Sequence, residues 1–366
     1  MCSILILGAG KIGACISALF LQESDYQVTV VDRCFEKPDF KRLQKKYPAL
    51  KVEKLDIQNE SDAEKFFNNN QFDAVISCLP FFVNATVAAY AAKYNMHYFD
   101  LTEDVHVTAE IKKIAKNSKV AFVPQCGLAP GITGIIAYDL VQHFEKVESI
   151  KLRVGALPQH TTHALHYALT WSTEGMINQY INDCSTIREG KHVLVPAMQD
   201  LELIEVEGLR YEAFNTSGGL GSLTEICDSN VNTLNYKTIR YIGHCEKMRF
   251  LLFDLRLIEE RETLKRILER AIPTTYQDVV MLYISADGWK HGHFVEESFV
   301  ARIFPQIVAE LEWSAIQIAT ATGACMVVDH ILSEHQKYKG LVLQETLPFP
   351  AIKQNRFYEY VTFHQV

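Results

Sequence analysis

The chain has 366 residues, of which 48% are apolar and 22% charged, a composition typical of globular proteins that excludes a disordered or collagen-like chain. At about 150 residues per domain, this length predicts roughly two domains. Thirty-six Lys and Arg against forty-four Asp and Glu give a formal net charge of −8. Because nucleic-acid-binding domains usually carry a basic excess, we expect no nucleic-acid partner.

The nine cysteines are odd in number, widely spaced and form no C-x-x-C pair. We therefore expect neither a disulfide framework nor a zinc site, and the scattered thiols indicate a reducing compartment. The first residues lack the basic region and cleavage site of a signal peptide. The uncharged stretch 313–328 is shorter than the about 20 apolar residues that a membrane span needs. The sequence predicts a buried helix there, and a cytoplasmic protein without a membrane partner.

The first 135 residues alternate short β-rich runs with helical segments. The predicted strands are Ser3–Leu7, Val28–Asp32, Val52–Leu55, Ala74–Ser77, His97–Asp100 and Ala121–Pro124. The predicted helices are Ile12–Glu23, Phe40–Lys46, Asp62–Asn68, Asn84–Tyr94 and Ala109–Lys116. This order indicates right-handed crossovers and a parallel sheet. The fold class is therefore α/β, with a doubly wound Rossmann domain over residues 1–130.

The pattern changes after about residue 145. We predict a strand at Ser149–Leu157, a helix at Glu174–Asp183, and then short strands without regular helices between them. These strands are His192–Val195, Leu203–Glu205, Tyr211–Asn215, Thr238–Ile242, Val279–Ala286 and Gly292–Phe299. They indicate an inserted α+β domain with a mainly antiparallel sheet over residues 131–305. The apolar segment Glu310–Glu334 predicts a helix that returns to the first domain, within a C-terminal section 306–366.

A glycine-rich motif, Gly8-Ala9-Gly10-Lys11-Ile12-Gly13, joins the first predicted strand to the first predicted helix. This is the context in which G-x-G-x-x-G indicates dinucleotide binding. Gly8 would permit the tight turn, Gly10 would let a pyrophosphate approach the backbone, and Gly13 would let the helix pack closely on the sheet. The free N–H groups of the helix would hold the phosphates. The alternative is a plain glycine-rich turn.

The ends of the next strands supply further candidates for cofactor binding. Asp32 can accept both ribose hydroxyls and repels a 2′-phosphate, which favours NAD, whereas Arg33 could hold that phosphate, so NADP stays open. Asp56 either borders the adenine or is an ordinary loop acid. Ligands of such sheets bind beyond the carboxyl ends of the strands. We therefore expect the loop Ser77-Cys78-Leu79-Pro80 to flank the ribose and nicotinamide.

Several segments resemble the saccharopine dehydrogenase family, both its glutamate-forming saccharopine dehydrogenases and its lysine 6-dehydrogenases. They are Val123–Gly131, Asn84–Thr102, Trp171–Gly175, Glu212–Gly219, Tyr236–His244 and the tail segments Lys339–Glu345 and Asn355–Phe357. The resemblance implies a Rossmann domain with an inserted substrate domain, and its motifs are more specific for the family than for the substrate. It also implies a homodimer and NAD(P)-dependent oxidation, or reductive formation, of a C–N bond in an amino acid.

This chemistry needs an acid–base group near the substrate nitrogen, because the amine must be unprotonated when hydride leaves the adjacent carbon. Asp100, Thr102 and Glu103 end the fifth strand, and we expect Asp100 to contact the substrate amine. A turn or helix N-cap role is its alternative. Arg240 is the expected carboxylate ligand and His244 a candidate acid–base residue. The alternative for both is a structural or solvated role.

Further substrate contacts are expected from Thr102, Ser172, Thr216, Ser217 and Lys237. Ser172 is alternatively a helix N-cap, and Thr216 with Ser217 alternatively part of a hairpin loop. Lys237 lies three residues before Arg240 and so faces away from it or acts at the strand end.

Saccharopine-forming relatives carry an arginine in the segment that matches 216–219, and its absence here favours a lysine-like substrate. Lysine 6-dehydrogenase is therefore an alternative activity, and a catalytically silent dinucleotide-binding sensor is an alternative of another class. His160, His163 and His166 lie at three-residue intervals but lack nearby Cys or acid ligands. We predict no metal site there.

Overall fold

The computed structural model describes residues 1–227, 231–361 and 364–365. The chain divides into two compact units. Unit 1 comprises residues 1–132, 307–313 and 317–361, and unit 2 comprises the described residues of 133–306 and 314–316 with 364–365. The changes of unit near residues 132 and 306 lie close to the predicted domain limits.

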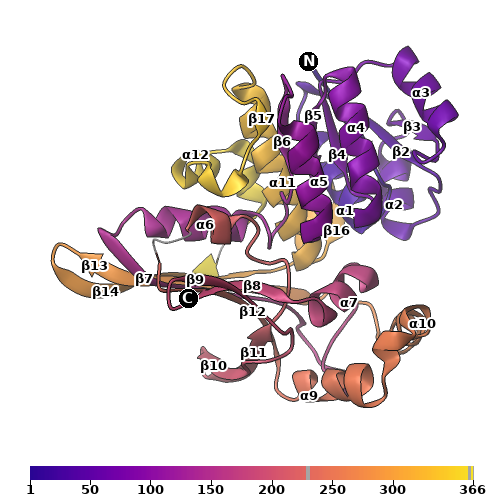
Figure 1. The fold of residues 1–366 in the computed structure, drawn as a ribbon. Coiled ribbons are helices and arrows are strands. Elements are labelled where there is room, and N and C mark those ends of the chain that lie inside the picture. The colour runs from indigo at the N-terminus through magenta and orange to yellow at the C-terminus, as the bar shows by residue number, and fades with distance from the viewer. Residues whose placement is uncertain (228–230, 362–363, 366) are drawn as a thin grey trace. The chain divides into compact units, whose positions relative to one another are not determined.

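Unit 1 is built on a seven-stranded parallel sheet with the order β17-β6-β5-β4-β1-β2-β3 (Figure 1). Its strands are β1 (Cys2–Leu7), β2 (Tyr26–Asp32), β3 (Lys51–Lys54), β4 (Ala74–Ser77), β5 (His97–Asp100), β6 (Ala121–Val123) and β17 (Gly340–Leu341). Residues 4–7 of β1 are at most 1% exposed, as expected for a strand covered on both faces. The predicted parallel α/β sheet is confirmed.

The helices of unit 1 follow the predicted order. They are α1 (Lys11–Phe20), α2 (Pro38–Lys46), α3 (Glu60–Asn69), α4 (Asn84–Tyr94) and α5 (Val105–Ala115). The helices α4 and α5 run side by side along the sheet (Figure 1). Buried apolar residues of β1, β4 and α4, among them Leu5, Val75 and Val87, belong to one core cluster. This packing fixes the position of the carboxyl ends of the strands, where the loops begin.

The long helix α11 (Ala315–Ser333) returns to unit 1, as predicted. Its Gln317 Nε2 donates to the Lys11 carbonyl of α1 at 3.4 Å. The helix begins later than the predicted residue 310, because Ala309 and Glu310 have φ of 56° and 59° and form the turn of a small hairpin. This hairpin joins β15 (Gln306–Val308) to β16 (Leu311–Trp313).

By length and hydropathy, α11 is the one helix in the described residues that could cross a membrane. Its most apolar window is 78% buried inside the protein, which matches the predicted buried helix. Such a helix is also common in the core of a packed domain.

The C-terminal segment completes unit 1 with β17 and α12 (Phe349–Lys353). The Arg356 guanidinium contacts Asp25 at 2.9 Å and also pairs with Asp329 of α11. The Phe357 ring lies 5.1 Å from the ring of Phe20 in α1, in an edge-to-face arrangement. These contacts attach the end of the chain to the first helix.

Unit 2 contains a mixed, mainly antiparallel sheet with the order β10-β11-β12-β7-β13-β14-β18, and β8 joins β12 to β9. Its strands are β7 (Lys146–Pro158), β8 (Cys184–Arg188), β9 (Lys191–Val195), β10 (Glu202–Val206), β11 (Leu209–Asn215), β12 (Thr233–Tyr241), β13 (Asp278–Lys290), β14 (His293–Ile303) and β18 (His364–Gln365). Only β12 and β7 pair in parallel among these strands as described. The predicted α+β domain is confirmed.

The prediction that no regular helices separate the short strands of unit 2 is wrong. The helices between these strands are α8 (Leu223–Ile226), α9 (His244–Arg249) and α10 (Arg261–Ala271), and the π-helical turn η2 (Phe250–Asp254) follows α9. The helix α6 (Ile132–Val141) precedes β7, and α7 (Thr173–Ile181) corresponds to the helix predicted at Glu174–Asp183. In α10, Leu264 and Leu268 are buried at a spacing of four residues. One buried stripe in an otherwise charged segment is sufficient for a surface helix.

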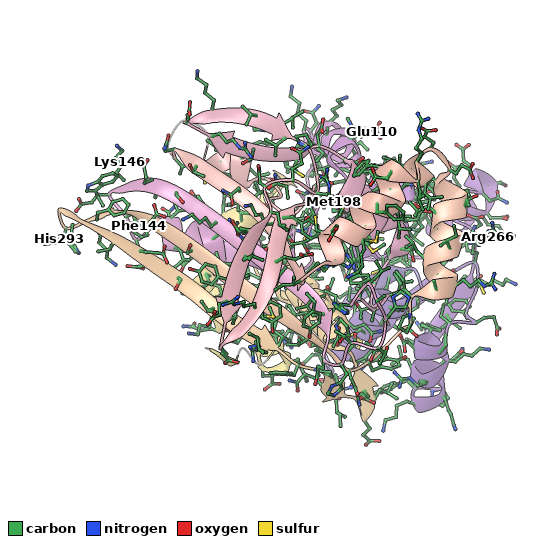
Figure 2. The ribbon with its side chains drawn as sticks, turned by 90° about the horizontal axis from the view of Figure 1, so that it is seen from below. Glu110, Phe144, Lys146, Met198, Arg266 and His293 are labelled. Atoms are coloured by element: carbon green, nitrogen blue, oxygen red, sulfur yellow. The ribbon has the colours of Figure 1, made fainter. Side chains whose placement is uncertain are left out.

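The strands β13 and β14 form a long hairpin, and Figure 2 shows His293 at its tip. The two turn residues, His291 and Gly292, have φ of 53° and 77°. Two consecutive positive φ values match the right-handed twist of the strands.

Candidate functional site

The glycine-rich loop of unit 1 is shaped by three glycines that differ in their surroundings. Gly8 has a φ of 108°, and a Cβ there would lie 2.9 Å from the Cys78 carbonyl oxygen. A Cβ on Gly13 would lie 1.9 Å from the Gly8 carbonyl oxygen. A Cβ on Gly10 would meet no atom within 4 Å. Gly8 and Gly13 are therefore required by packing, whereas Gly10 borders open space.

This loop fits a dinucleotide pyrophosphate. Gly10 is the N-cap of α1 and provides no side chain to occupy the first N–H groups of the helix. These N–H groups and the positive end of the helix dipole attract an anion. The open space beside Gly10 is where a phosphate would approach the backbone. The predicted cofactor-binding residues Gly8–Gly13, with Lys11 and Ile12 opening α1, are thus brought together in one turn.

Asp32 ends β2 beside this loop. Its carboxylate accepts the N–H of Ala9 at 2.6 Å and of Cys34 at 2.9 Å, so the loop and the strand end hold it in place. Arg33 is exposed and forms no ion pair with any residue that the structure describes. Asp56 is exposed and accepts the N–H of Gln58 at 3.0 Å, as a turn residue would.

The loop after β4 leaves the sheet next to Gly8. Ser77 Oγ donates to Asn84 Oδ1 at 2.7 Å, which ties the strand end to α4. Leu79 packs on the core and Pro80 is exposed. Burial, with a smaller effect of Asp100, raises the pKa of the Cys78 thiol to about 12. The thiol therefore stays protonated, which favours the role of a small apolar residue over that of a nucleophile.

Asp100 is fully buried at the end of β5. Its carboxylate accepts the N–H of Thr102 at 2.9 Å, the N–H of Gln125 at 3.0 Å and the Tyr98 hydroxyl at 2.6 Å. Burial raises its pKa to about 6, although these three donors oppose the rise. With both oxygens bonded within the fold, the geometry favours the alternative turn role over the predicted contact with a substrate amine.

The residues after Asp100 form a short loop before α5. Thr102 Oγ1 accepts the N–H of Asp104 at 3.1 Å, and Asp104 Oδ1 accepts the N–H of Val107 at 2.9 Å as the N-cap of α5. Glu103 is partly buried, and the one hydrogen bond of its carboxylate among the described residues comes from its own backbone N–H. Burial, followed by repulsion from Asp104 and Asp100, raises its pKa to about 7. The sequence located Glu103 at the strand end but gave no reason to select it over Asp100.

Arg240 of β12 is 2% exposed. Its Nε donates to the Tyr180 hydroxyl at 2.9 Å, and its Nη1 donates to the Ile239 carbonyl at 2.8 Å. The guanidinium carbon lies 5.0 Å from the ring centre of Tyr167 and 6.0 Å from that of Tyr180. Burial alone would lower its pKa, but the tyrosine hydroxyls outweigh this and the pKa is raised. The group therefore stays charged.

No carboxylate of the described residues pairs with Arg240. Glu212 lies opposite Arg240 in the register of β11 and β12, but it accepts the N–H of Gly243 at 2.8 Å and of Cys245 at 2.5 Å. Other buried cations of unit 2 are neutralised, because Glu202 pairs with both Arg153 and Lys237. Arg240 is thus a buried charge without a counter-ion in the part of the chain that the structure describes.

His244 begins α9 and is fully buried. One ring nitrogen, Nε2, lies 3.0 Å from the Tyr180 hydroxyl, and Nδ1 lies 2.8 Å from the Leu165 carbonyl oxygen. Burial, with a smaller effect of the Arg240 charge, lowers its pKa to about 3. A histidine that stays neutral and has both nitrogens occupied favours the structural alternative over the predicted acid–base role.

The other predicted substrate contacts have partners within unit 2. Ser172 Oγ accepts the N–H of Gly175 at 3.2 Å and caps α7, which is the alternative role. Ser217 Oγ donates to the Asn178 carbonyl at 3.2 Å, and Lys237 Nζ contacts Glu202 at 2.7 Å. Thr216 differs, because its buried hydroxyl has no hydrogen-bond partner. Among the predicted contacts in the described structure, Thr216 therefore has an unpaired hydroxyl and Arg240 a charge without a carboxylate partner.

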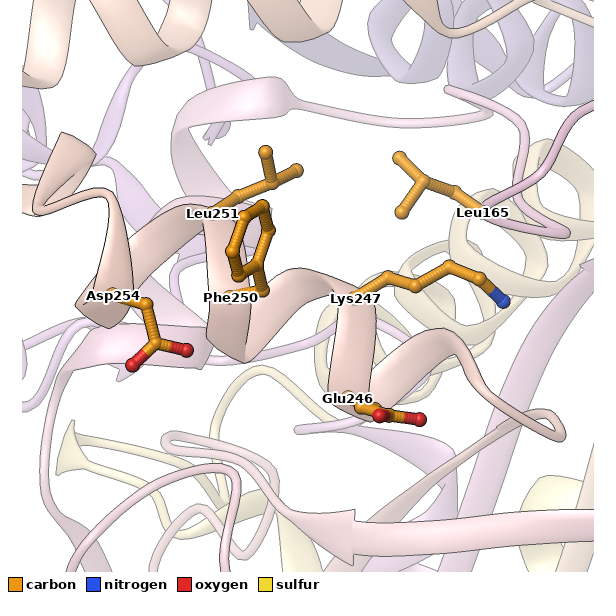
Figure 3. A pocket seen from close by; sticks show the side chains of 6 residues that line it. All are labelled: Leu165, Glu246, Lys247, Phe250, Leu251 and Asp254. Atoms are coloured by element: carbon orange, nitrogen blue, oxygen red, sulfur yellow. The ribbon is translucent and has the colours of Figure 1, made fainter.

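A pocket of about 480 Å³ lies elsewhere in unit 2, beside α9 and η2 (Figure 3). It is lined by Leu165, Glu246, Lys247, Phe250, Leu251 and Asp254. None of the predicted site residues lines it. The nearby His163 Nδ1 accepts the N–H of Leu165 at 3.2 Å, and the described residues contain no group of three potential metal ligands.

Two family models match consecutive parts of the chain. The saccharopine dehydrogenase NADP binding domain matches residues 4–123, and the saccharopine dehydrogenase C-terminal domain matches residues 127–356. A curated relative from Pyricularia oryzae, saccharopine dehydrogenase [NADP(+), L-glutamate-forming], is 26% identical over 332 residues, which cover 86% of this chain and 71% of the relative. The chain spans 30% to 45% of the length of other curated relatives that it matches.

Two solved structures share the fold over the whole of this chain. Apo saccharopine dehydrogenase (L-Glu forming) from Saccharomyces cerevisiae has a TM-score of 0.78 at 17% identity, with all of that chain covered. Homospermidine synthase from Legionella pneumophila, in complex with NAD, has a TM-score of 0.72 at 12% identity, with 91% of that chain covered. Both show the same fold, and the family models agree with the resemblance found in the sequence. The chain belongs to the saccharopine dehydrogenase family.

Proposed function

We propose that this NAD(P)-binding oxidoreductase acts on the C–N bond of an amino acid, as a saccharopine dehydrogenase-like enzyme of lysine metabolism. The observation that carries the proposal is Arg240, a buried guanidinium without a carboxylate partner among the described residues. Burying an unpaired charge costs several kcal/mol. A substrate carboxylate would neutralise it, and arginine binds carboxylates through two N–H groups.

The cofactor would be held by the loop Gly8–Gly13 and by Asp32, with the loop Ser77–Pro80 on the other side of β1. The bound nicotinamide supplies the hydride chemistry. The chain's own residues fix the pyrophosphate at the start of α1 and keep the Cys78 thiol protonated beside it. These residues orient the cofactor without providing a competing nucleophile.

We propose NAD as the preferred cofactor. Asp32 is held at the end of β2 by two N–H groups, and its charge would repel a 2′-phosphate. The homospermidine synthase structure was solved with NAD, whereas the matching family model and the Pyricularia relative are described by NADP. Arg33, exposed beside Asp32, is the residue that would favour NADP.

The substrate that the residues favour within this proposal is lysine-like. The segment 216–219 has the sequence Thr-Ser-Gly-Gly and contributes no cation. Because Glu202 neutralises Arg153 and Lys237, Arg240 is the one buried cation of the described sheet face that is left for a carboxylate. A substrate with a single carboxylate, as in lysine 6-dehydrogenation, would need one such cation.

A catalytically silent dinucleotide-binding sensor is a second candidate. It is favoured by Asp100 and His244, whose polar atoms are all bonded within the fold. Binding of NADH or NADPH without turnover of any amine would support this candidate.

We further propose that the protein acts in the cytoplasm as a homodimer, since all nine thiols are free and the family resemblance implies a dimer.

The test is reduction of NAD or NADP in the presence of lysine or of saccharopine. In Arg240→Met, we expect the KM for the amino acid to rise roughly 10- to 100-fold, which corresponds to the loss of a charge-assisted hydrogen bond. Methionine fills a similar volume, so folding should persist. Arg266→Met, on the exposed face of α10, is the matched control (Figure 2). An unchanged KM in Arg240→Met would refute the role of Arg240.

A further inference from the structure

The loop after β5 begins at the same edge of the sheet as the glycine-rich loop after β1. The register aligns Leu7 of β1 with Ser77 of β4, and Ser77 with Asp100 of β5. These residues form one row across three adjacent parallel strands. At about 4.8 Å between strands, the end of β5 lies about 10 Å from the end of β1. Residues that follow Asp100 therefore belong to the same edge as Gly8.

This edge is the side of β1 on which a nicotinamide is expected. Asp32, the residue suited to the adenosine ribose, ends β2, which pairs with β1 on the opposite side from β4. A dinucleotide that is held by its pyrophosphate at β1 places its two halves over opposite sides of that strand. The loops after β4 and β5 then flank the half that reacts.

Glu103 is held in this loop by its neighbours, while its own carboxylate bonds only to its own backbone N–H in the described structure. The N–H of Thr102 donates to Asp100, and Thr102 Oγ1 accepts the N–H of Asp104. Asp104 is in turn fixed as the N-cap of α5. The backbone on both sides of Glu103 is thus anchored. Among the described residues, its carboxylate has no partner in another residue and accepts only its own backbone N–H, whereas Asp104 caps α5.

The surroundings of Glu103 favour proton exchange near neutral pH. The charged groups that act on it are the carboxylates of Asp104 and Asp100, and both repel its negative form. No cation of the described residues offsets this repulsion. Together with burial, they raise its pKa to about 7. Asp100 has a similar environment, but its oxygens are all bonded, so it is poorly placed to exchange a proton with a ligand.

We propose that Glu103 is the acid–base residue that takes the proton from the substrate nitrogen. This inference rests on the proposed function. In the step, the carboxylate of Glu103 forms an O–H bond as the N–H bond of the substrate ammonium breaks. The electron pair stays on nitrogen, so the products are a neutral amine and a neutral carboxylic acid. In the reverse direction, Glu103 returns the proton.

The first test observes Glu103 without any ligand. In protein labelled with ¹³C at the glutamate carboxyl, one resonance should titrate with a midpoint near pH 7. It should be lost in Glu103→Gln and kept in Glu110→Gln, which changes an exposed glutamate on α5 (Figure 2). If the resonance that disappears in Glu103→Gln titrates near pH 4.5, the inference is overturned.

The second test uses the pH profile of turnover with the best amine substrate. We expect kcat/KM of the native chain to rise with pH up to about 7, and Glu103→Gln to lower kcat roughly 10²- to 10⁴-fold at neutral pH. The loss should shrink as the pH approaches the substrate amine's own pKa of about 10, because solvent then removes the proton. NADH affinity should be unchanged, since Glu103 does not hold the phosphates.

The two proposals fail in different ways. If the native chain oxidises an amine and Glu103→Gln retains its rate and its profile, the role of Glu103 is refuted and the proposed function stands. If the native chain turns over no amine, the proposed function is refuted, and with it the proton transfer that rests on it. A loss in Glu103→Gln that is equal at every pH points to a structural role and also overturns the inference.

Discussion

Polar residues that lie close together in the sequence differ in the structure in the hydrogen-bond and ion-pair partners of their side chains. Asp100 and Glu103 lie three residues apart, but Asp100 accepts three hydrogen bonds from other residues, whereas Glu103 accepts only its own N–H in the described structure. Arg240 and Lys237 share one strand, but only Lys237 has a carboxylate partner among the described residues. Glu103 and Arg240 are therefore distinguished by a charged group that has no partner of opposite charge among the described residues, and not by their residue type.

Cofactor choice is also decided by single residues, at the end of β2. Asp32→Asn removes a negative charge and keeps an oxygen that can accept the N–H of Ala9. We expect the affinity for NADPH to improve roughly five- to tenfold relative to NADH, because about 1 kcal/mol of repulsion is removed. Fluorescence titration with each reduced cofactor measures the ratio.

Arg33→Ala is the complementary variant for this prediction. It should weaken NADPH binding and leave NADH binding unchanged, because a 2′-phosphate is present only in NADPH. Arg33 is exposed and unpaired in the described structure, so its removal should not affect folding. A ratio that stays the same in both variants would show that neither residue reads the 2′ position.

At the scale of elements, the loop between β1 and α1 contains one glycine that is needed for folding and another that is needed for cofactor binding. A Cβ on Gly13 would lie 1.9 Å from the Gly8 carbonyl oxygen, so Gly13→Ala should destabilise the protein by at least about 1–3 kcal/mol. A Cβ on Gly10 would meet no atom within 4 Å, so Gly10→Ala should fold normally. Its methyl group would instead occupy the space that a pyrophosphate needs, and NADH affinity should fall.

These two variants form a matched pair, because each adds the same methyl group to the same loop. Thermal unfolding measures the first effect and NADH titration the second. A Gly10→Ala protein that binds NADH as tightly as the native chain would contradict a pyrophosphate at this loop.

Elements could be predicted from the sequence where periodicity and local chemistry agree. The strands β4 and β5 and the helix α4 have the predicted bounds, since each is a short apolar run with clear flanks. The helix α10 was not predicted, because most of its residues are charged and the apolar periodicity consists only of Leu264 and Leu268, with Ile272 directly after the helix. The predicted start of α11 was wrong because the left-handed turn at Ala309 and Glu310 uses residues that usually favour helices.

Site residues were predicted less well, because their roles depend on partners that are distant in the sequence. The glycine-rich loop is local, and its predicted geometry fits. The ring of His244 is bonded to Tyr180, 64 residues away, and to Leu165, 79 residues away, and its neutral state follows from burial among such distant residues. The bonds of Asp100 include Gln125 from the loop after β6. A pattern of residue types does not contain these contacts. The burial of these side chains and their hydrogen-bond partners could therefore be learned only from the structure.

At the scale of the whole molecule, buried ionisable groups predict how stability depends on pH. The pKa of His244 is lowered from 6.5 to about 3, so below pH 6.5 the unfolded chain binds a proton that the folded chain excludes. Stability from this group is therefore lost as pH falls. Asp100 and Glu103 have raised pKa values and act in the opposite direction, because the folded chain binds their protons first.

The histidine contribution can be isolated by substitution. Between pH 6.5 and 4, we expect His244 to cost the native chain about 2–3 kcal/mol of unfolding free energy. His244→Gln should remove this loss and leave a slope set by the two carboxyl groups, so that acid is tolerated better. Denaturant unfolding at several pH values measures the slope. The control is His106→Gln, an exposed histidine of α5, and an equal slope in all three proteins would contradict the prediction.

The parallel sheet of unit 1 has consequences for how the chain is made. Its edge strand β17 and Arg356, which pairs with Asp25, emerge from the ribosome about 200 residues after β6. At roughly 5–20 residues per second, the early strands wait on the order of 10–40 s for them. Throughout that interval the nascent first half lacks its last strand and the helix that shields α1, and it is then most exposed to chaperones and to misassembly.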